Sequence, residues 1–365
     1  MSDTYNGARL ETLRLIHGLS QSEFGKRLDV TQSRLSRIER GELAVTHELV
    51  ARASEAFGEP LSFFSVPSSA IPLGPVAFRR RSAARAADKH RTVTLFQEAA
   101  RVFYSVSERA QYREVEAVPE GELDPERAAI TIRGLSGLSA DEPVRNVTRL
   151  LERLGVGVVT ELDDDDHASD INDVSGVAMP TALNRRPLVA TNPIARGDVQ
   201  RLTIAHELGH VILDRHAASV SCAIRSPQER AAFEFGAALL LPARAVERKV
   251  GERSTLRDYL ELKAEYGISA IAAVGRAYRL GLISEDRRRT LSIQHSSRGW
   301  RYDEPVAVDV EKPLLLQQAM EKVYPSFSHA RASHDLGVRP DRLRRWTGRP
   351  QEAGRPANVT PFRAR

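Results

Sequence analysis

Two histidines four positions apart, in the sequence HELGH at residues 206–210, constrain this chain more than any other feature. On an α-helix, residues four positions apart lie on the same face, so His206 and His210 can both reach one metal ion. The glutamate between them, Glu207, stands where a zinc hydrolase carries its general base. The pattern predicts a helix that binds Zn²⁺ through both histidines and hydrolyses peptide bonds with Glu207 as catalytic base.

The residues around this motif also fit a metal site. In residues 201–214, RLTIAHELGHVILD, apolar side chains occupy the other faces, which predicts a buried helix. A catalytic zinc takes three protein ligands and leaves one position for water. The third ligand is expected from the helix predicted over 227–241, which a Ser-Pro pair begins. That helix offers two candidates, Glu229 and Glu234.

The N-terminal part indicates a DNA-binding motif. Residues 19–41 have the pattern of a helix, a tight turn and a second helix, and Ser20 with Glu23 forms a capping-box pattern at the first helix. In a helix-turn-helix, the second helix enters the major groove and its first residues reach base edges. Glutamine can pair with adenine and arginine with guanine, and the start of the first helix can contact a phosphate. The candidate DNA contacts are Gln21, Gln32, Ser33, Arg34 and Arg37.

The segments LSQ, VTQ, LSRIERG and a closing PLSFF, all within residues 8–65, resemble the lambda-repressor-like (Xre-type) domain. The resemblance implies an all-α domain that binds double-stranded operator DNA, usually a palindrome, as a homodimer. Residues 1–66 hold eight basic and nine acidic side chains, so positive charge would have to be local. The alternative is a small helical interaction domain.

Residues 145–245 resemble the ImmA/IrrE family of zinc metallopeptidases. The resemblance rests on a strand ending LVATN, the helix with RLTIAHELGH, and an E-x-x-A…F-x-x-x-L-L-x-P segment. It implies that Glu229 completes the zinc site with the two histidines, and Glu234 is the second choice. Three positions depart from residues common in the family without removing a ligand or the base: Asp214, Phe233 and Gly236.

Composition and charge limit the kind of protein this can be and where its charged surfaces lie. With 41% hydrophobic residues the chain can form several cores, and its one cysteine, Cys222, excludes an internal disulfide. No long apolar run or signal core is present, which predicts a cytoplasmic protein without a membrane segment. Positive charge concentrates in residues 79–91 and 331–365, and the second cluster has nine arginines against three acidic residues. Such clusters can attract phosphates or form solvated surfaces.

The periodicities predict a mainly α fold with a small β-sheet, of the α+β class. Strands are expected at 155–160, 174–179 and 187–191, and residues 66–78 are interpreted as a linker because they hold three prolines and a glycine. The pair of strands within residues 174–191 either offers an edge to which an extended substrate adds as a strand, or only supports the HELGH helix. The expected parts are a helix-turn-helix domain (1–66), a linker and long helical connector (67–142), a zincin-like metallopeptidase domain (143–292) and a helical C-terminal region (293–365).

The C-terminal region allows two interpretations. Residues 327–348 indicate a second helix, turn and helix, with arginines that fit phosphate contacts. This element either contacts nucleic acid or serves dimerisation or packing. The Pro-, Gly- and Arg-rich tail after it is predicted to be disordered. Three further residues with metal-binding side chains are interpreted as lying outside the metal site: His167, His216 and Cys222.

The two motifs together predict a transcription regulator that carries a zinc-dependent metalloendopeptidase domain. The resemblance to the ImmA/IrrE family implies a stress- or ligand-responsive proteolytic switch that acts on a repressor, either a partner or this chain itself. A rival interpretation keeps the metal without proteolysis, so that a ligand or peptide in the cleft changes DNA binding. A third is a protease whose helix-turn-helix docks a protein partner.

Overall fold

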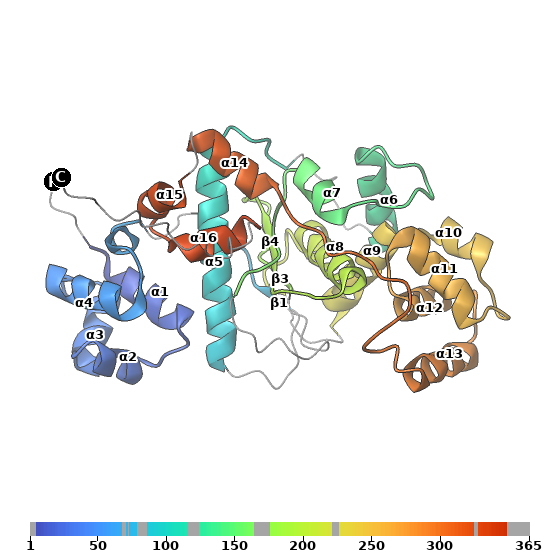
Figure 1. The fold of residues 1–365 in the computed structure, drawn as a ribbon, viewed down its shortest axis with the longest axis horizontal. Coiled ribbons are helices and arrows are strands. Elements are labelled where there is room, and N and C mark those ends of the chain that lie inside the picture. The colour runs from blue at the N-terminus through green and yellow to red at the C-terminus, as the bar shows by residue number, and fades with distance from the viewer. Residues whose placement is uncertain are drawn as a thin grey trace, which may run out of the picture.

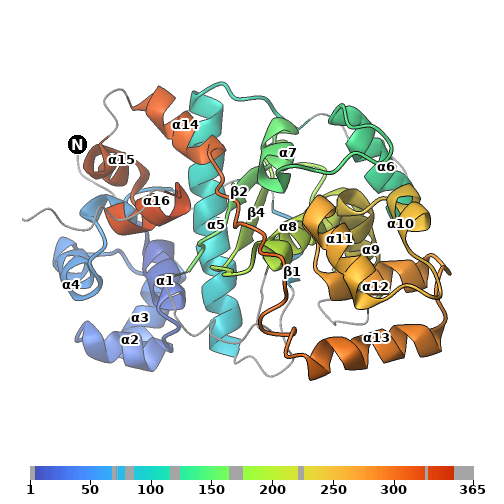
Figure 2. The same ribbon diagram turned by 45° about the vertical axis from the view of Figure 1, so that its right-hand side comes forward.

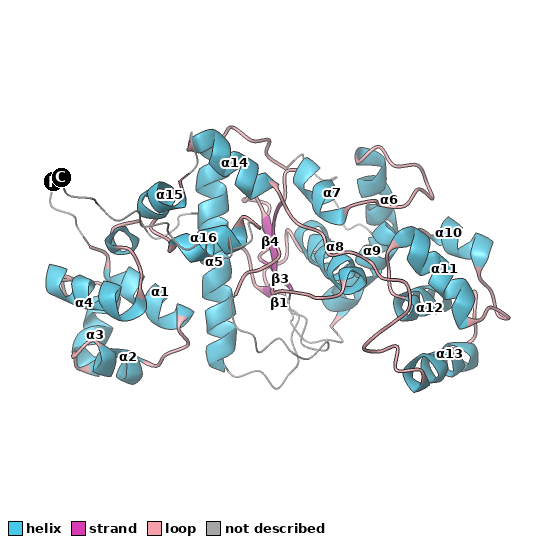
Figure 3. Cartoon of the chain, viewed as in Figure 1, coloured by secondary structure: helices cyan, strands magenta, loops and turns pink. Residues whose placement is uncertain are grey.

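A computed structural model describes residues 5–67, 71, 73–78, 86–115, 124–163, 176–220, 226–324 and 328–348. Helices dominate these residues, and a small sheet lies near the centre of the molecule (Figure 3). The prediction of a mainly α fold with a small β-sheet is therefore confirmed.

The N-terminal domain consists of four short α-helices and one 3₁₀ helix, which are blue in Figure 1. A side chain caps the start of each α-helix, and the predicted capping box between Ser20 and Glu23 is present. The turn between the second and third helices places Asp29 in the left-handed region, with φ of 51°. The helices are α1 (Gly7–Ile16), α2 (Gln21–Arg27), α3 (Gln32–Glu39), α4 (His47–Phe57) and η1 (Leu61–Phe64).

Among the described residues the sheet has four strands, in the order β1-β3-β4-β2. β2 and β4 run parallel, whereas β3 is antiparallel to both of its neighbours. The three predicted strands are confirmed, and the linker predicted over 66–78 contributes a fourth, β1, that its local pattern did not indicate. These residues form a strand because their backbone pairs with β3, not because of their own local sequence pattern. The bounds are β1 (Ala77–Phe78), β2 (Gly157–Val159), β3 (Gly176–Ala178) and β4 (Leu188–Thr191).

Helices cover both faces of the sheet, α5 (Ala86–Arg109) on one face and α8 (Gly197–Leu213) on the other (Figure 1). Val159 and Ala190 pack in the core on the α5 side, whereas Val158 packs on the α8 side. Because alternate residues of a strand point to opposite faces, apolar residues on both faces bury the strands completely. The sheet is thus a rigid support for α8.

Further helices pack on the side of α8 that lies away from the sheet. The next helix in the chain runs along α8, and four more form a separate hydrophobic cluster beyond it, orange in Figure 1. These elements place the HELGH helix in the interior. The bounds are α6 (Pro125–Leu135), α7 (Val147–Arg153), α9 (Pro227–Leu240), α10 (Ala243–Lys249), α11 (Leu256–Tyr266), α12 (Ala270–Arg279) and α13 (Glu285–Ser297).

After α13 the chain returns across the molecule as an irregular segment over residues 298–314 (Figure 2). Two buried carboxylates hold this segment in place. Glu304 accepts a hydrogen bond of 2.7 Å from Nζ of Lys263. Glu311 accepts from the backbone N–H groups of Val147 and Thr148, at 3.0 and 2.8 Å. Long-range contacts to α7 and α11 therefore fix the irregular backbone of this segment.

The last helices pack against the N-terminal domain and α5 (Figures 1 and 2). A left-handed Gly337, with φ of 59°, makes the predicted tight turn between two of them. A buried ion pair of 2.7 Å joins Arg342 to Glu59, and Arg101 on α5 donates to the carbonyl of Leu336 at 2.9 Å. This placement supports the packing interpretation of the C-terminal element. The helices are α14 (Leu315–Val323), α15 (His329–Leu336) and α16 (Pro340–Trp346).

No helix in the described ranges is both long enough and apolar enough to span a bilayer. His167, Cys222, the tail from residue 349 onward and residues 79–85 of the first basic cluster lie outside the described residues.

Candidate metal centre and DNA-binding surface

Helices α8 and α9 together form the candidate metal centre, which is called the metal centre below. The α9 helix begins as its sequence predicts, because the Ser226 hydroxyl accepts a hydrogen bond of 3.2 Å from the Glu229 N–H and a proline occupies the first turn. The two helices approach closely at Gly236, where a Cβ would lie 2.9 Å from the backbone nitrogen of His206. The glycine therefore allows the first turn of α9 to stand beside the histidines.

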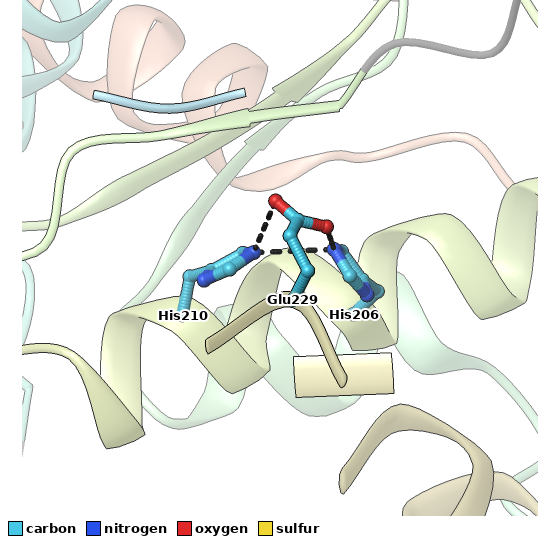
Figure 4. Close-up of side chains that lie close together, drawn as sticks. All are labelled: His206, His210 and Glu229. Carbon is cyan, nitrogen blue, oxygen red and sulfur yellow. Dashed lines mark hydrogen bonds and ion pairs between the residues drawn. The ribbon is translucent and has the colours of Figure 1, made fainter. Parts of the chain in front are cut away.

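His206, His210 and Glu229 converge on one point (Figure 4). The two Nε2 atoms are 3.2 Å apart, and the Glu229 oxygens lie 3.3 Å from that of His206 and 3.5 Å from that of His210. A tetrahedral zinc with bonds of about 2.0–2.2 Å separates its ligand atoms by about 3.3–3.6 Å. The donor types and their spacing thus fit zinc. Within the described ranges, these three form the group of side chains placed to share a metal ion.

The three donors are buried together, and the charge of each depends on the others. The exposed fractions of His206, His210 and Glu229 are 1%, 0% and 4%. Burial disfavours a charged imidazole, but hydrogen bonds to Asp214 and Glu229 raise the pKa of His210 to about 10. Burial also disfavours the Glu229 carboxylate, yet hydrogen bonds from the two histidines lower its pKa to about 2. Among the described residues, Glu229 forms ion pairs with these histidines alone.

Asp214 holds His210 from the side opposite to the centre. Its Oδ2 atom lies 2.6 Å from Nδ1 of His210. A metal-binding histidine commonly gives its second ring nitrogen to a carboxylate, which orients the ring. From the sequence, Asp214 stood out only as a departure from the family. Its spacing of four residues from His210 at the helix end was the signal for this contact.

Glu207, the predicted base, is fully buried between α8 and β3. The strand residue beside it is Gly176, where a Cβ would lie 2.1 Å from Oε1 of Glu207. Only a residue without a side chain leaves room for the carboxyl group there. The structure thus places the predicted base against the backbone of the strand that borders the metal centre.

The other candidates near the motif are placed apart from the three donors. Glu234, the second choice for third ligand, is not in the group that can share a metal ion. The ring of Phe233 lies edge-on to His206, with centroids 6.5 Å apart. His216 is exposed after the end of α8. Both departures in α9, Phe233 and Gly236, therefore border the site without displacing a donor.

The predicted DNA-reading helix, α3, presents its polar residues to solvent. Leu35 and Ile38 are buried in the core of the N-terminal domain, with exposed fractions of 0% and 1%. The residues expected to reach bases lie on the opposite face. All four are exposed: Gln32, Ser33, Arg34 and Arg37.

Gln21, the fifth DNA candidate, is engaged within the domain. Its side-chain amide donates a hydrogen bond of 2.7 Å to Glu39, which also forms a buried ion pair of 2.7 Å with Arg14. These contacts tie the start of α2 to the end of α3 and to α1. Gln21 therefore helps to fix the angle between the two helices of the motif.

Comparisons with known families agree with this division of the chain. Residues 10–64 match the helix-turn-helix family model. Residues 151–278 match the peptidase family model described as the IrrE N-terminal-like domain. Both resemblances stated from the sequence are confirmed. No curated protein matches the chain.

Proposed function

We propose that this chain, which joins a helix-turn-helix DNA-binding domain to an IrrE-like peptidase domain, is a transcription regulator with zinc-dependent endopeptidase activity. One observation carries the proposal: two imidazole nitrogens and a carboxylate lie at the mutual distances that a tetrahedral zinc requires. The helix that supplies the histidines also supplies Glu207, the residue type that such a site needs as base.

The division of roles follows from the contacts. His206, His210 and Glu229 would hold the zinc, and Asp214 would keep His210 in its orientation. Bound zinc supplies Lewis acidity, which activates a water and polarises a scissile carbonyl. Glu207 accepts the proton of the attacking water and passes it to the leaving amine.

The DNA-binding domain links peptide cleavage to transcription. The exposed polar face of α3 fits insertion into a major groove, and domains of this kind bind operators as homodimers. The substrate that suits such a chain is a repressor, either a partner or this chain itself, cleaved in response to stress or a ligand.

A second candidate function is supported by the burial of the site. Glu207 and His210 are both fully buried, so the donors lie in the interior rather than at an open surface. In that function, the chain retains the metal without cleaving peptides, and a ligand or peptide entering the site changes DNA affinity. Both functions require the same metal and differ in the role of Glu207.

The variant Glu207→Gln separates them. If the chain is a peptidase, E207Q binds zinc and DNA like the wild type but loses peptide cleavage by at least about 100-fold, the size typical of a lost general base. Zinc content, affinity for a duplex selected from a random pool, and cleavage of a peptide library are measured on the purified full chain. Glu234→Gln, on the neighbouring helix and outside the donor group, is the matched control.

A variant expected to weaken DNA binding shows that the DNA measurement can detect such a loss. Arg37→Ala is expected to cost about 1–3 kcal/mol in binding free energy if Arg37 reads a base.

A measurement in cells decides between the two functions. If E207Q regulates transcription in cells as the wild type does, the peptidase function is excluded and the metal-sensing function remains.

A further inference from the structure

The strand beside the metal centre already has a neighbour on its outer edge. An open strand edge can accept an extended peptide as an additional strand. β3 lies at this position, since Gly176 contacts the predicted base. β1 pairs with β3 in antiparallel fashion, with Ala77 opposite Ala178 and Phe78 opposite Val177. The edge that suits a substrate is therefore occupied by this chain.

Residues 73–78, here called the inner strap, are closely fitted to that edge. A Cβ at Gly74 would lie only 1.5 Å from the carbonyl oxygen of Pro180, which follows β3. Leu73 and Val76 pack against the core cluster that includes Val177. Ala77 is completely buried. Backbone pairing, apolar packing and a glycine without space for a side chain thus all hold the strap in one register.

The register leads the strap toward the predicted base. Along β3, Val177 is followed in the N-terminal direction by Gly176, whose backbone lies against Glu207. Phe78, the last paired residue of β1, is opposite Val177 and so lies one step from the residue that contacts the base. A peptide paired with β3 in this register would therefore run toward the reacting groups.

We propose that the inner strap is a built-in occupant of the peptide-strand site beside the metal centre, and that an extended peptide binds there only after the strap has left. This inference rests on the proposed function and specifies its regulation. The ligand class is an extended segment with glycine at the place of Gly74, because the Pro180 carbonyl excludes any side chain there.

The strap also connects the two functions of the chain. It follows η1, the last helix of the DNA-binding domain, and precedes α5, which packs on that domain and on the sheet. A peptide that displaces the strap changes the connection between the DNA-binding domain and the rest of the molecule. Substrate binding and DNA binding are thereby coupled through residues 73–78.

A binding experiment tests the proposal without relying on cleavage. The probe is a fluorescent decapeptide with the sequence of residues 71–80, titrated by anisotropy into zinc-loaded full-length protein carrying E207Q. Gly74→Ala in the protein forces the strap from Pro180 and is expected to tighten peptide binding by about tenfold or more, since the competent state becomes the main population. The matched control is Gly251→Ala, where a Cβ meets nothing within 4 Å.

The same substitution placed in the peptide gives the complementary control. A decapeptide with alanine at the position of Gly74 should bind the G74A protein at least about tenfold more weakly, because its Cβ meets the Pro180 carbonyl. If G74A protein binds the original peptide no better than the wild type, or if G251A gains as much, the strap is not the occupant. If G74A gains affinity but no variant with an intact Glu207 cleaves any peptide, the inference stands and the peptidase function fails.

A locking variant decides the matter if G74A does not fold. Opposite residues of an antiparallel pair have Cα atoms about 4.5–5.5 Å apart, within the range that a disulfide bridges. Ala77→Cys with Ala178→Cys, in a Cys222→Ser background, joins the strap to β3. Oxidation should lower peptide affinity by at least about tenfold and reduction should restore it. Equal affinity in both states would overturn the proposal.

Discussion

The metal centre and the junction between the DNA-binding domain and the rest of the chain both bury charged side chains, but they balance the charge differently. At the metal centre, the ion-pair partners of Glu229 are the two histidines. At the junction, defined here as the contacts of Glu59 and Glu98 with arginines, each carboxylate has a guanidinium partner. At the metal centre the carboxylate faces ring nitrogens that can also bind a metal ion, whereas at the junction each carboxylate faces a permanently charged guanidinium group.

The two carboxylates of the junction differ in their pKa values. Burial disfavours the Glu98 carboxylate, but Arg101 and Arg9 outweigh it and lower its pKa to about 2. At Glu59, burial outweighs the nearby Arg342 and Arg339 and raises the pKa. Glu98 therefore stays ionised at neutral pH, and its ion pair with Arg9 joins α5 to α1.

The largest effect is expected at the metal centre. His210→Ala removes one of three protein ligands from a site whose binding free energy, for structural zinc, is about 10–16 kcal/mol. We expect a loss of about 4 kcal/mol, or about 1000-fold in zinc affinity, measured by competition with a chelating dye. The control His216→Ala changes an exposed histidine six residues further on and should bind zinc normally. Full zinc affinity in H210A would show that the three donors do not act as one site.

The junction should respond next. Glu98→Gln leaves Arg9 and Arg101 buried without their carboxylate, and breaking a buried ion pair in this way costs about 3–5 kcal/mol. Urea unfolding of the full chain should report this loss while zinc affinity stays unchanged. Glu55→Gln, on the exposed face of α4, is the control and should change stability by less than about 0.5 kcal/mol. A stable E98Q would mean that the ion pairs of Glu98 are not needed to hold the junction.

A smaller effect is expected from the residue that orients a ligand. Asp214→Asn weakens the contact to Nδ1 of His210 and should lower zinc affinity by about 10–100-fold, the range for carboxylates behind a metal ligand. The same chelator competition measures it. If D214N binds zinc as tightly as the wild type, the backbone and packing alone orient His210.

A further effect concerns the pH dependence of stability near the junction. The ring of His17 packs against that of Phe57 in a tilted arrangement, with centroids 4.7 Å apart. Burial, followed by the nearby Arg342 and Arg91, lowers its pKa from 6.5 to about 4. Between these values the unfolded state binds the proton more readily, so stability falls as pH drops from about 6.5 to about 4. His17→Asn should flatten the melting temperature across this window, and His47→Asn, an exposed control, should not.

The comparison also explains which parts could be predicted from sequence. His206 and His210 lie four residues apart on one helix, so helix periodicity brings them together, whereas the choice of Glu229 over Glu234 came from the resemblance to the ImmA/IrrE family. The Glu59–Arg342 pair joins residues 283 positions apart, and no local pattern indicates it. Its arginine lies in the C-terminal helix pair, whose pattern indicated helices but left their role open.

The same reasoning applies to β1 and to Gln21. Residues 66–78 have the composition of a linker, and β1 forms only because β3 offers an edge about 100 residues further along the chain. Gln21 has the position of a phosphate contact, yet Glu39 lies within reach of its amide. Spacing within a helix thus predicted the two histidine ligands, whereas pairing between distant segments determined what surrounds them.

The central claim is that His206, His210 and Glu229 hold one zinc ion in a DNA-binding protein. Its most direct test is a crystal structure of the full chain purified without added metal, with diffraction data collected on both sides of the zinc absorption edge. The account predicts one anomalous peak per chain, bonded to the three donors at about 2.0–2.2 Å. The absence of that peak, together with zinc well below one equivalent per chain by mass spectrometry, would contradict it.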